Sequence, residues 1–413
     1  MSEAGLPPVP RPDHVPPELV VNFDLYAVEG AEEDVQLAYH AFQQNCPDIF
    51  WTPLNGGHWV ATRAEDIETM QRDYARFSHR RIVLPKAPEY MPRQLPLEFD
   101  PPYHTQIRKP LTGALLPKVV NALEDKVRAL TIDLIEAFKA RGECEFVTEF
   151  AQQLPIQIFL DLVNLPREDR HKLLPLTEEA VRGRTAEVKM GAQMAVFGYI
   201  GATVAERRAN PGDDLLSPLV NAVVDGNKIS EFEATAYATL VLFGGLDTVA
   251  AMLSFVTRFL ALNPGHRKQL IDHLDDDAYM RNAIEELLRR HGIANTAREI
   301  TGDFEYKGVH FKQGEMILPP NLLFGLDERK VDNPLTVDFE RPAPIRHATF
   351  GNGPHTCPGA VLARRELRIF LEEWLRRIPI FSIKQGTKPV LVTGMVNGVL
   401  KLELAWPTEA ASS

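Results

Sequence analysis

The residues best suited to chemistry lie in one glycine-rich stretch, Phe350-Gly351-Asn352-Gly353-Pro354-His355-Thr356-Cys357-Pro358-Gly359. Its glycines indicate tight backbone geometry. A helix is predicted to begin at about Ala360, so Cys357 would lie just before a helix N-terminus, where the dipole and the free amides favour a thiolate. A thiolate presented in this way can ligate iron. The alternative, which is commoner for an isolated cysteine, is a buried structural residue.

A second candidate site is Gly244-Gly245-Leu246-Asp247-Thr248, within a long apolar stretch. Two adjacent glycines in a helix interior cost roughly 1 kcal/mol each relative to alanine, which suggests that something approaches the backbone there. Gly244 and Thr248 share a helical face because they are four residues apart. An aspartate beside a threonine on a weakened helix could relay protons. Close helix packing, with Asp247 in an ion pair, is the competing interpretation.

Two charged pairs have helical spacing but carry little information alone. His104 and Arg108 are four residues apart and could grip an anion, although an exposed helix start has the same pattern. Glu286 and Arg289 are three residues apart, which by itself indicates a solvated surface pair worth a few tenths of a kcal/mol.

The elements that must position these motifs are mostly helices. Ser230 followed by Glu233 is a capping box, and the apolar pattern after it continues to Leu262. We expect this helix to cross the middle of the molecule. A second helix is predicted from about residue 278 to 290. The fold class is therefore mainly α with a smaller β-rich portion.

The rest of the chain divides into stretches of distinct pattern. Trp59–Thr62 reads as a strand after the turn residues Asn55-Gly56-Gly57. Residues 101–290 and 360–378 are predicted to be helical, and residues 300–350 and 381–406 to hold strands. Residues 1–17 form a proline-rich N-terminal arm, and the remainder, 18–413, is expected to be a single intertwined domain.

Composition excludes several classes of protein. The 413 residues carry a net charge of −11 without a basic run, which argues against nucleic acid as a partner. No apolar stretch reaches the ~18 residues of a membrane helix, and no leader pattern opens the chain, so we expect a cytoplasmic protein. The three cysteines, Cys46, Cys144 and Cys357, are widely spaced, which speaks against a disulfide framework.

Taken together, the four motifs favour the functional interpretation of each one over its structural alternative. HxxxR, GGxDT, ExxR and FxxGxxxCxG, in this order and spacing, resemble those of the cytochrome P450 family of haem-thiolate monooxygenases. The resemblance extends from about Val20 to the end of the chain. It is strongest to soluble bacterial members that oxidise camphor and other terpenoids. It implies the P450 fold for residues 18–413 and haem b as the cofactor.

The resemblance also assigns roles to residues. Cys357 would be the axial ligand of the haem iron, and Glu286, Arg289 and Arg341 would form a buried salt-bridge cluster behind its loop. The residues implied to contact haem are His104, Arg108, Gly244, Gly245, Arg298, Phe350, Gly351, His355 and Gly359.

Asp247 and Thr248 would be the catalytic acid–alcohol pair that controls proton delivery to dioxygen. The activity implied is hydroxylation of a C–H bond with dioxygen and two ferredoxin-delivered electrons. A peroxide-driven haem-thiolate enzyme and a non-catalytic haem-binding sensor are the alternatives, and retention of the pair disfavours both.

The implied substrate contacts are mostly apolar, which suggests a small hydrophobic molecule such as camphor, cineole or a norisoprenoid. Two departures from the camphor-oxidising pattern bear on the choice. Val83 replaces an aromatic residue, and Pro92 stands where a tyrosine is expected, with Tyr90 two residues away. The implied contacts are Val83, Tyr90, Leu240, Phe243, Ala294, Met395 and Val396.

The resemblance finally implies partners and a mobile lid. Electrons would come from a [2Fe-2S] ferredoxin with its reductase, drawn to basic residues that include Arg108 and Arg346. Residues 166–212 would form lid helices over the substrate. Arg80 replaces an acidic residue near a bound cation, so no such cation site is expected. We expect a monomer without membrane or nucleic-acid partners.

Overall fold

The computed structural model describes residues 7–182 and 186–408, and the chain divides into two compact units. The first unit comprises the residues up to Arg93, Ala251–Cys357, and the residues from Ile378 onward. The second comprises Gln94–Ala250 and Pro358–Arg377. Neither unit is one continuous stretch of the chain.

The first unit combines helices with a five-stranded mixed sheet. Its helices are α1 (Val35–Gln44), α2 (Ala64–Arg72), α11 (Pro264–Asp272), α12 (Asp277–Arg290), α13 (Asn321–Leu326), the end of α10 (Glu231–Leu262), and the 3-10 turns η1 (Pro17–Leu19) and η4 (Gly353–His355). The sheet has the order β1 (Ile49–Thr52), β2 (His58–Ala61), β10 (Met316–Leu318), β7 (Arg298–Ile300) and β3 (Phe77–Ser78). The hairpins and pairs beside it are β8 (Phe304–Tyr306) with β9 (Val309–Phe311), β12 (Val390–Val392) with β13 (Gly398–Lys401), and β11 (Ser382–Ile383) with β14 (Glu403–Ala405).

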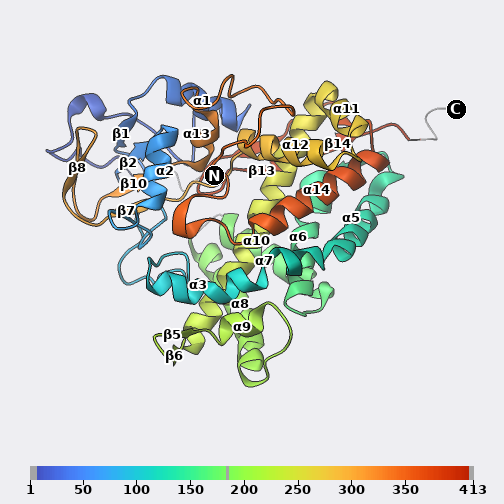
Figure 1. Ribbon diagram of the computed structural model, residues 1–413, viewed down its shortest axis with the longest axis horizontal. Coiled ribbons are helices and arrows are strands. Elements are labelled where there is room, and N and C mark those ends of the chain that lie inside the picture. The colour runs from blue at the N-terminus through green and yellow to red at the C-terminus, as the bar shows by residue number, and fades with distance from the viewer. Residues whose placement is uncertain (1–6, 183–185, 409–413) are drawn as a thin grey trace. The chain divides into compact units, whose positions relative to one another are not determined.

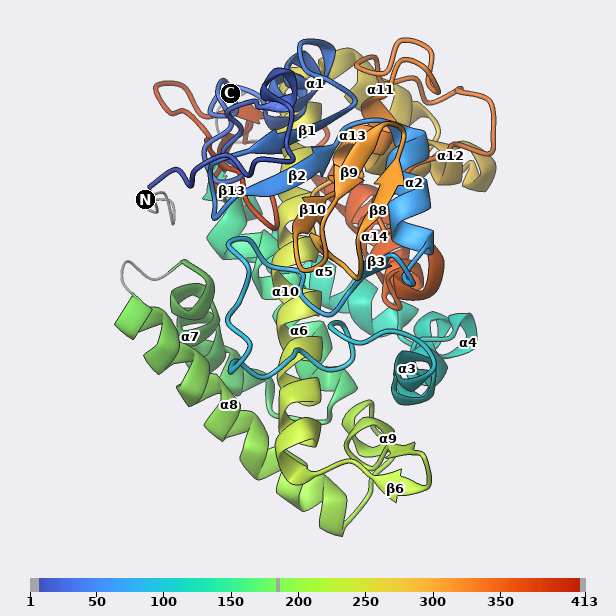
Figure 2. The same ribbon diagram turned by 90° about the vertical axis from the view of Figure 1, so that its left-hand side faces the viewer.

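Local sequence explains the β1–β2 hairpin. Asn55, Gly56 and Gly57 all have positive φ (49°, 85° and 77°), a conformation that asparagine and glycine adopt at least cost. The hairpin extends the sheet because β2 pairs in parallel with β10, and the two strands lie side by side in Figure 2. Trp59 and Phe311 meet edge to face in the apolar core below this sheet.

The proline-rich segment packs on this unit. The described residues 7–16 form neither helix nor strand, but Val15 is fully buried in the core below the sheet. The backbone N–H of Val9 donates to the carbonyl of Pro53 at 2.9 Å. The segment is therefore anchored at both of these points.

His58 should make the protein sensitive to acid. It is fully buried on β2, and desolvation lowers the pKa of its imidazole to about 3. Below pH ~6.5 the unfolded chain takes up a proton that the folded chain refuses, so stability present above that pH is lost as pH falls, by about 1.4 kcal/mol per pH unit. Urea unfolding at about pH 7.5 and 5 should show a loss about 2 kcal/mol larger in the wild type than in His58→Gln. Equal losses would contradict the assignment.

The second unit is almost entirely helical. Its helices are α3 (Tyr103–Ala114), α4 (Pro117–Asn121), α5 (Glu124–Lys139), the π-helix η2 (Val147–Ala151), α6 (Gln153–Leu162), the 3-10 turn η3 (Arg167–Asp169), α7 (Arg170–Arg182), α8 (Ala186–Ala209), α9 (Leu216–Val220), α10 up to Ala250, and α14 (Ala360–Arg377). Its strands are β4 (Glu143–Glu145), β5 (Val223–Val224) and β6 (Asn227–Lys228).

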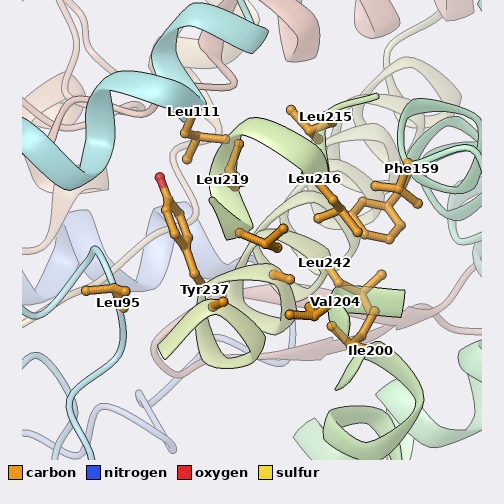
Figure 3. Close-up of a cluster of buried hydrophobic side chains, with 14 of the residues drawn as sticks. Leu95, Leu111, Phe159, Ile200, Val204, Leu215, Leu216, Leu219, Tyr237 and Leu242 are labelled. Atoms are coloured by element: carbon orange, nitrogen blue, oxygen red, sulfur yellow. The ribbon is translucent and has the colours of Figure 1, made fainter. Parts of the chain in front are cut away.

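Helix α10 begins where the capping box predicts. Ser230 Oγ accepts from the backbone N–H of Glu233 at 3.2 Å, and the Glu233 carboxylate accepts from the N–H of Ser230 at 2.8 Å. One face of α10 packs into the main apolar core of this unit, where Tyr237 and Leu242 meet side chains of α3, α6, α8 and α9 (Figure 3). Tyr237 also donates through its hydroxyl to the carbonyl of Ile107 at 3.0 Å.

Contrary to the expectation from the sequence, one described helix, α10, is long and apolar enough to cross a membrane, because a few polar residues within it leave its mean hydropathy high; half of its most apolar stretch is buried within the structure. Length and composition of this kind also fit a core helix of a soluble protein.

Helix α14 runs along α5 (Figure 1). Arg128 on α5 pairs with both Glu372 and Glu373 of α14, and Arg365 of α14 donates to Glu124 at 2.6 Å. The phenyl ring of Phe146 and the indole of Trp374 meet edge to face at 5.2 Å nearby. These contacts fix the helix that directly follows the cysteine loop.

The predicted elements agree with the structure in type. The helices expected over 230–262, 278–290 and 360–378 are present, as are the strand near Trp59 and the C-terminal strands. The fold class, mainly α with a smaller β-rich portion, is confirmed.

Candidate active site

The cysteine loop, residues 350–359, is held by its own backbone. The N–H of Cys357 donates to the carbonyl of Phe350, and the N–H of Gly351 to that of Ala348, both at 2.8 Å. Phe350, Gly351, His355 and Gly359 are half-buried, whereas Cys357 is exposed. The interpretation of Cys357 as a buried structural thiol is therefore wrong.

The loop rests on helix α2 at a point where only glycine fits. Gly353 has φ +71°, and a Cβ there would lie 2.8 Å from the carbonyl oxygen of Gln71. The side chain of Gln71 both accepts and donates a hydrogen bond. Its Oε1 accepts from Asn352 at 2.8 Å, and its Nε2 donates to Asn321 Oδ1 at 2.7 Å. The loop is thus tied to α2 and to the start of α13.

The ExxR pair lies in a buried ion cluster, as the resemblance implied. The carboxylate of Glu286 accepts two bonds from Arg289 at 2.7 Å and one from Arg341 at 2.9 Å. The side chains of Glu286 and Arg289 are both 0% exposed. A solvated surface pair, the interpretation from spacing alone, is wrong because Arg341 closes the cluster from 52 residues further along the chain.

Two predicted haem contacts of the first unit are Arg298 on β7 and His355 within the cysteine loop. Arg298 is buried at the start of β7, and its Nη1 donates to the hydroxyl of Thr296 at 3.0 Å. The ring of His355 stacks on that of His79 with centroids 3.3 Å apart. These contacts restrict the orientation of both side chains.

The HxxxR motif lies on α3 in the second unit. His104 is buried, and Arg108, one turn later, is half-buried. An exposed helix start, the alternative for this motif, is wrong for His104 because only 2% of the residue is exposed.

The GGxDT motif lies on α10, where Leu246 belongs to the apolar core and the two glycines face away from it. Gly244 and Gly245 are exposed, and no atom lies within 4 Å of where a Cβ would stand on either. Close helix packing through these glycines is therefore wrong. The hydroxyl of Thr248 donates to the Gly244 carbonyl at 2.8 Å, and Asp247 beside it is half-buried. Leu240 and Phe243, one turn earlier, are half-buried as well.

Most of the predicted substrate contacts in the first unit lie close to one another. Ala294 pairs with Val396 in an isolated antiparallel bridge, so Ala294, Met395 and Val396 lie together. All three are half-buried. The segment with Val83 lies beside them, because the carbonyl of Ile82 accepts from the N–H of Ala297 at 2.9 Å.

Tyr90 does not join this group. Its side chain is 86% exposed, so the prediction that it contacts substrate is not supported by this structure. The physical reason is Arg81, which is buried and donates to the carbonyls of Pro88, Glu89 and Met91 at 3.0–3.2 Å. The loop wraps its backbone around the guanidinium and leaves Tyr90 outside.

Sequence reasoning missed the polar residues that tie these segments together. Gln71, Asn295 and Asn397 are buried side chains with no motif around them. Asn352 was part of the cysteine loop but had no role assigned. The only sequence signal was Gly353, since a glycine in a loop before a helix can mark a close backbone approach.

The donor set suits a haem group. An exposed thiol on a loop held by backbone hydrogen bonds could ligate the iron of a haem. Buried arginine and histidine side chains suit the two carboxylates of such a group. The open face of α10 at Gly244 and Gly245 offers room for a flat ring to approach the backbone.

Comparison with known proteins gives consistent matches. The family model "Cytochrome P450" matches residues 155–404. A probable cytochrome P450 127A1 of Sinorhizobium fredii is 35% identical over 407 residues, which cover 96% of this chain and 97% of that protein. A steroid C26-monooxygenase of Mycobacterium tuberculosis is 32% identical, and the match covers 84% of this chain and 87% of that protein. The crystal structure of CYP101J2 has a TM-score of 0.88 at 36% identity, covering 97% of this chain and 100% of that one.

Proposed function

This chain belongs to the cytochrome P450 family of haem-dependent monooxygenases, and from that premise we propose that it hydroxylates a small terpenoid with electrons from a [2Fe-2S] ferredoxin. The observation that carries the proposal is Cys357. Among the three cysteines of the chain, it alone has an exposed thiol, and that thiol lies on the loop whose sequence matches the family motif.

The residue assignments follow from the family resemblance. Cys357 ligates the haem iron, while cationic side chains hold the propionates and the glycines of both motifs leave room for the ring. When bound, haem supplies dioxygen activation and the oxidising power for the C–H bond. The residues assigned to binding haem are His104, Arg108, Gly244, Gly245, Arg298, Phe350, Gly351, His355 and Gly359.

Asp247 and Thr248 control protons in this proposal. The hydroxyl hydrogen of Thr248 is engaged by the Gly244 carbonyl at 2.8 Å, so the hydroxyl oxygen can accept a hydrogen bond, for example from a water. Asp247, the residue before Thr248 on the helix, is only half-buried, so we assign to it the transfer of protons from solvent.

We therefore expect both residues to affect how reducing equivalents are used. Thr248→Ala keeps the helix and removes the hydroxyl, so product formed per NADH consumed should fall by about tenfold, with peroxide released instead.

Asp247→Asn should lower turnover by about 100-fold, within the range for losing a proton donor. Product and peroxide are measured together in a reconstituted assay.

Thr257→Ala is the matched control. Thr257 lies on the same helix and donates in the same way to the carbonyl four residues earlier, that of Leu253, at 2.7 Å. Its loss should leave the ratio of product to NADH unchanged. An equal decrease in both threonine variants would assign the effect to the helix and not to proton control.

The terpenoid class is supported by the apolar character of the proposed contacts and by the resemblance of the sequence motifs to those of camphor-oxidising members of the family. Those contacts are Val83, Leu240, Phe243, Ala294, Met395 and Val396. The similarity to a steroid C26-monooxygenase makes a steroid the competing substrate class. We propose further that the described parts of residues 166–212, which include α7 and α8, act as the lid; residues 183–185 of that range lie outside the described residues. We also propose that the enzyme works in the cytoplasm as a monomer.

The first experiment is the carbon monoxide difference spectrum of the reduced protein. A red-shifted Soret band is expected, and its absence in a folded, haem-supplied sample would overturn the assignment of Cys357. Monoterpenoids, norisoprenoids and steroids are then compared for the low- to high-spin shift. Turnover should require ferredoxin and reductase; turnover with peroxide alone would favour a peroxide-driven enzyme, and haem binding without any product would favour a sensor.

A further inference from the structure

Buried carboxamide side chains connect the cysteine loop to the segments proposed to contact substrate. We call them the amide chain: Asn352, Gln71, Asn321, Asn295 and Asn397. All lie in the first unit, and all except the half-buried Asn352 are buried, with exposed fractions of 0–6%. Buried amides require partners, since an unpaired one costs about 1–3 kcal/mol.

The first half of the amide chain starts at the cysteine loop. Asn352 Nδ2 donates to Gln71 Oε1 at 2.8 Å, and Gln71 Nε2 donates to Asn321 Oδ1 at 2.7 Å. The backbone N–H of Asn321 then donates to the carbonyl of Ala294 at 3.2 Å. Three consecutive bonds therefore lead from the loop that carries Cys357 to a proposed substrate contact.

The second half is a clamp between two segments about a hundred residues apart. The N–H of Asn295 donates to the Met395 carbonyl at 2.8 Å, and the N–H of Asn397 to the Ile293 carbonyl at 2.9 Å. These bonds flank the pairing of Ala294 with Val396.

The side chains of the clamp fix its register. Asn295 Nδ2 donates to the Gly394 carbonyl at 2.8 Å and to Asn397 Oδ1 at 3.2 Å. Asn397 Oδ1 also accepts from the Gly394 N–H at 3.3 Å. The hydroxyl of Tyr39 lies 3.4 Å from Asn295 Nδ2 and closes the group from helix α1. A slip of one residue would break every one of these bonds.

We propose that the amide chain is a positioning device for the substrate. It holds the paired backbone of Ala294 and Val396 at a fixed place relative to the cysteine loop, with Gln71 as its central positioning residue. None of these amides is a catalytic residue; they act through the backbone that they hold. This inference rests on the proposed function, because it takes Ala294, Met395 and Val396 as substrate contacts.

The test uses the full-length, haem-loaded enzyme with 1,8-cineole and camphor as probes. Gln71→Leu keeps the approximate size of the side chain and removes both of its bonds. Asn397→Ser shortens the clamp and provides a second variant should the first fail to fold. Gln36→Leu is the matched control, because Gln36 is a fully buried glutamine on α1 of the same unit and is outside the amide chain.

We expect Gln71→Leu and Asn397→Ser to change the ratio of hydroxylated regioisomers, and to lower product per NADH, by at least about threefold, since displacements near 1 Å can cost ~100-fold in rate. The carbon monoxide spectrum should remain that of a thiolate complex. The double variant should be no worse than the more affected single variant, because both act on one connected network. Gln36→Leu should keep the wild-type ratio.

The result that overturns the inference is a normal regioisomer ratio and normal coupling in folded, haem-loaded Gln71→Leu and Asn397→Ser. That outcome would leave the amides as stabilising residues only. Failure of the proposed function is distinguishable, since it would show in the wild type as a missing thiolate spectrum or as no product from any probe.

Discussion

Cys357→Ser is expected to abolish the red-shifted carbon monoxide band and to lower product formation by at least about 100-fold. A serine hydroxyl stays protonated at neutral pH, so it cannot replace the anionic thiolate as a ligand of the iron. The fold should persist, because Cys357 is exposed and the hydrogen bonds that shape its loop come from the backbone. Absorption spectra of the reduced, carbon monoxide-treated protein and far-UV circular dichroism measure the two effects.

The other two cysteines supply controls within the same chain. Burial raises the pKa of the Cys46 thiol to about 12 and raises that of Cys144 as well, so both stay protonated at neutral pH. Cys46→Ser and Cys144→Ser should keep the thiolate spectrum. Loss of the spectrum in either variant, with Cys357→Ser unchanged, would identify a different iron ligand.

Glu286→Gln is expected to cause the largest loss of stability. The carboxylate lies fully buried between Arg289 and Arg341, and its removal leaves two guanidinium groups without their counter-charge. Removing one partner from a buried ion pair costs about 3–5 kcal/mol. The substitution should also weaken the segment around Asp338, because the backbone N–H of Asp338 donates to this carboxylate at 3.0 Å. Urea unfolding measures the change in free energy, and haem content reports whether the cysteine loop survives.

Asp272→Asn is the comparison for an exposed pair. Asp272 accepts from Lys268 one helical turn earlier on α11, at 2.5 Å, and both side chains are largely in solvent. Exposed pairs of this kind contribute about 0.3–0.5 kcal/mol. Similar small losses in both variants would show that the Glu286 cluster is not required for the fold.

Local signals account for most of what the sequence predicts correctly. The start of α10 is encoded by Ser230 and Glu233, three residues apart, and the loop before α14 by its glycines. Each depends on neighbours in the chain, so spacing alone identifies it. The cysteine loop and the long helix were therefore within reach of sequence reasoning.

The features that could not be predicted from the sequence depend on contacts between residues far apart in the chain. The spacing of Glu286 and Arg289 describes a surface pair equally well until Arg341 is seen beside it. Tyr90 is near the expected position in the chain, but the carbonyls bound to Arg81 determine that its side chain faces solvent. Gln71 has no pattern that distinguishes it from any other glutamine, because both of its partners are more than 200 residues away.

The order of strands in the five-stranded sheet has a consequence for synthesis on the ribosome. Strand β2 ends at residue 61, but its parallel neighbour β10 begins at residue 316. At about 5–20 residues per second, roughly 10–50 s pass between the appearance of the two strands. During that time the apolar edge around Trp59 has no partner, although the helices of the second unit up to Ala250 are already complete in sequence. The nascent chain thus presents an open strand edge to chaperones for most of its elongation, and the sheet can close only late.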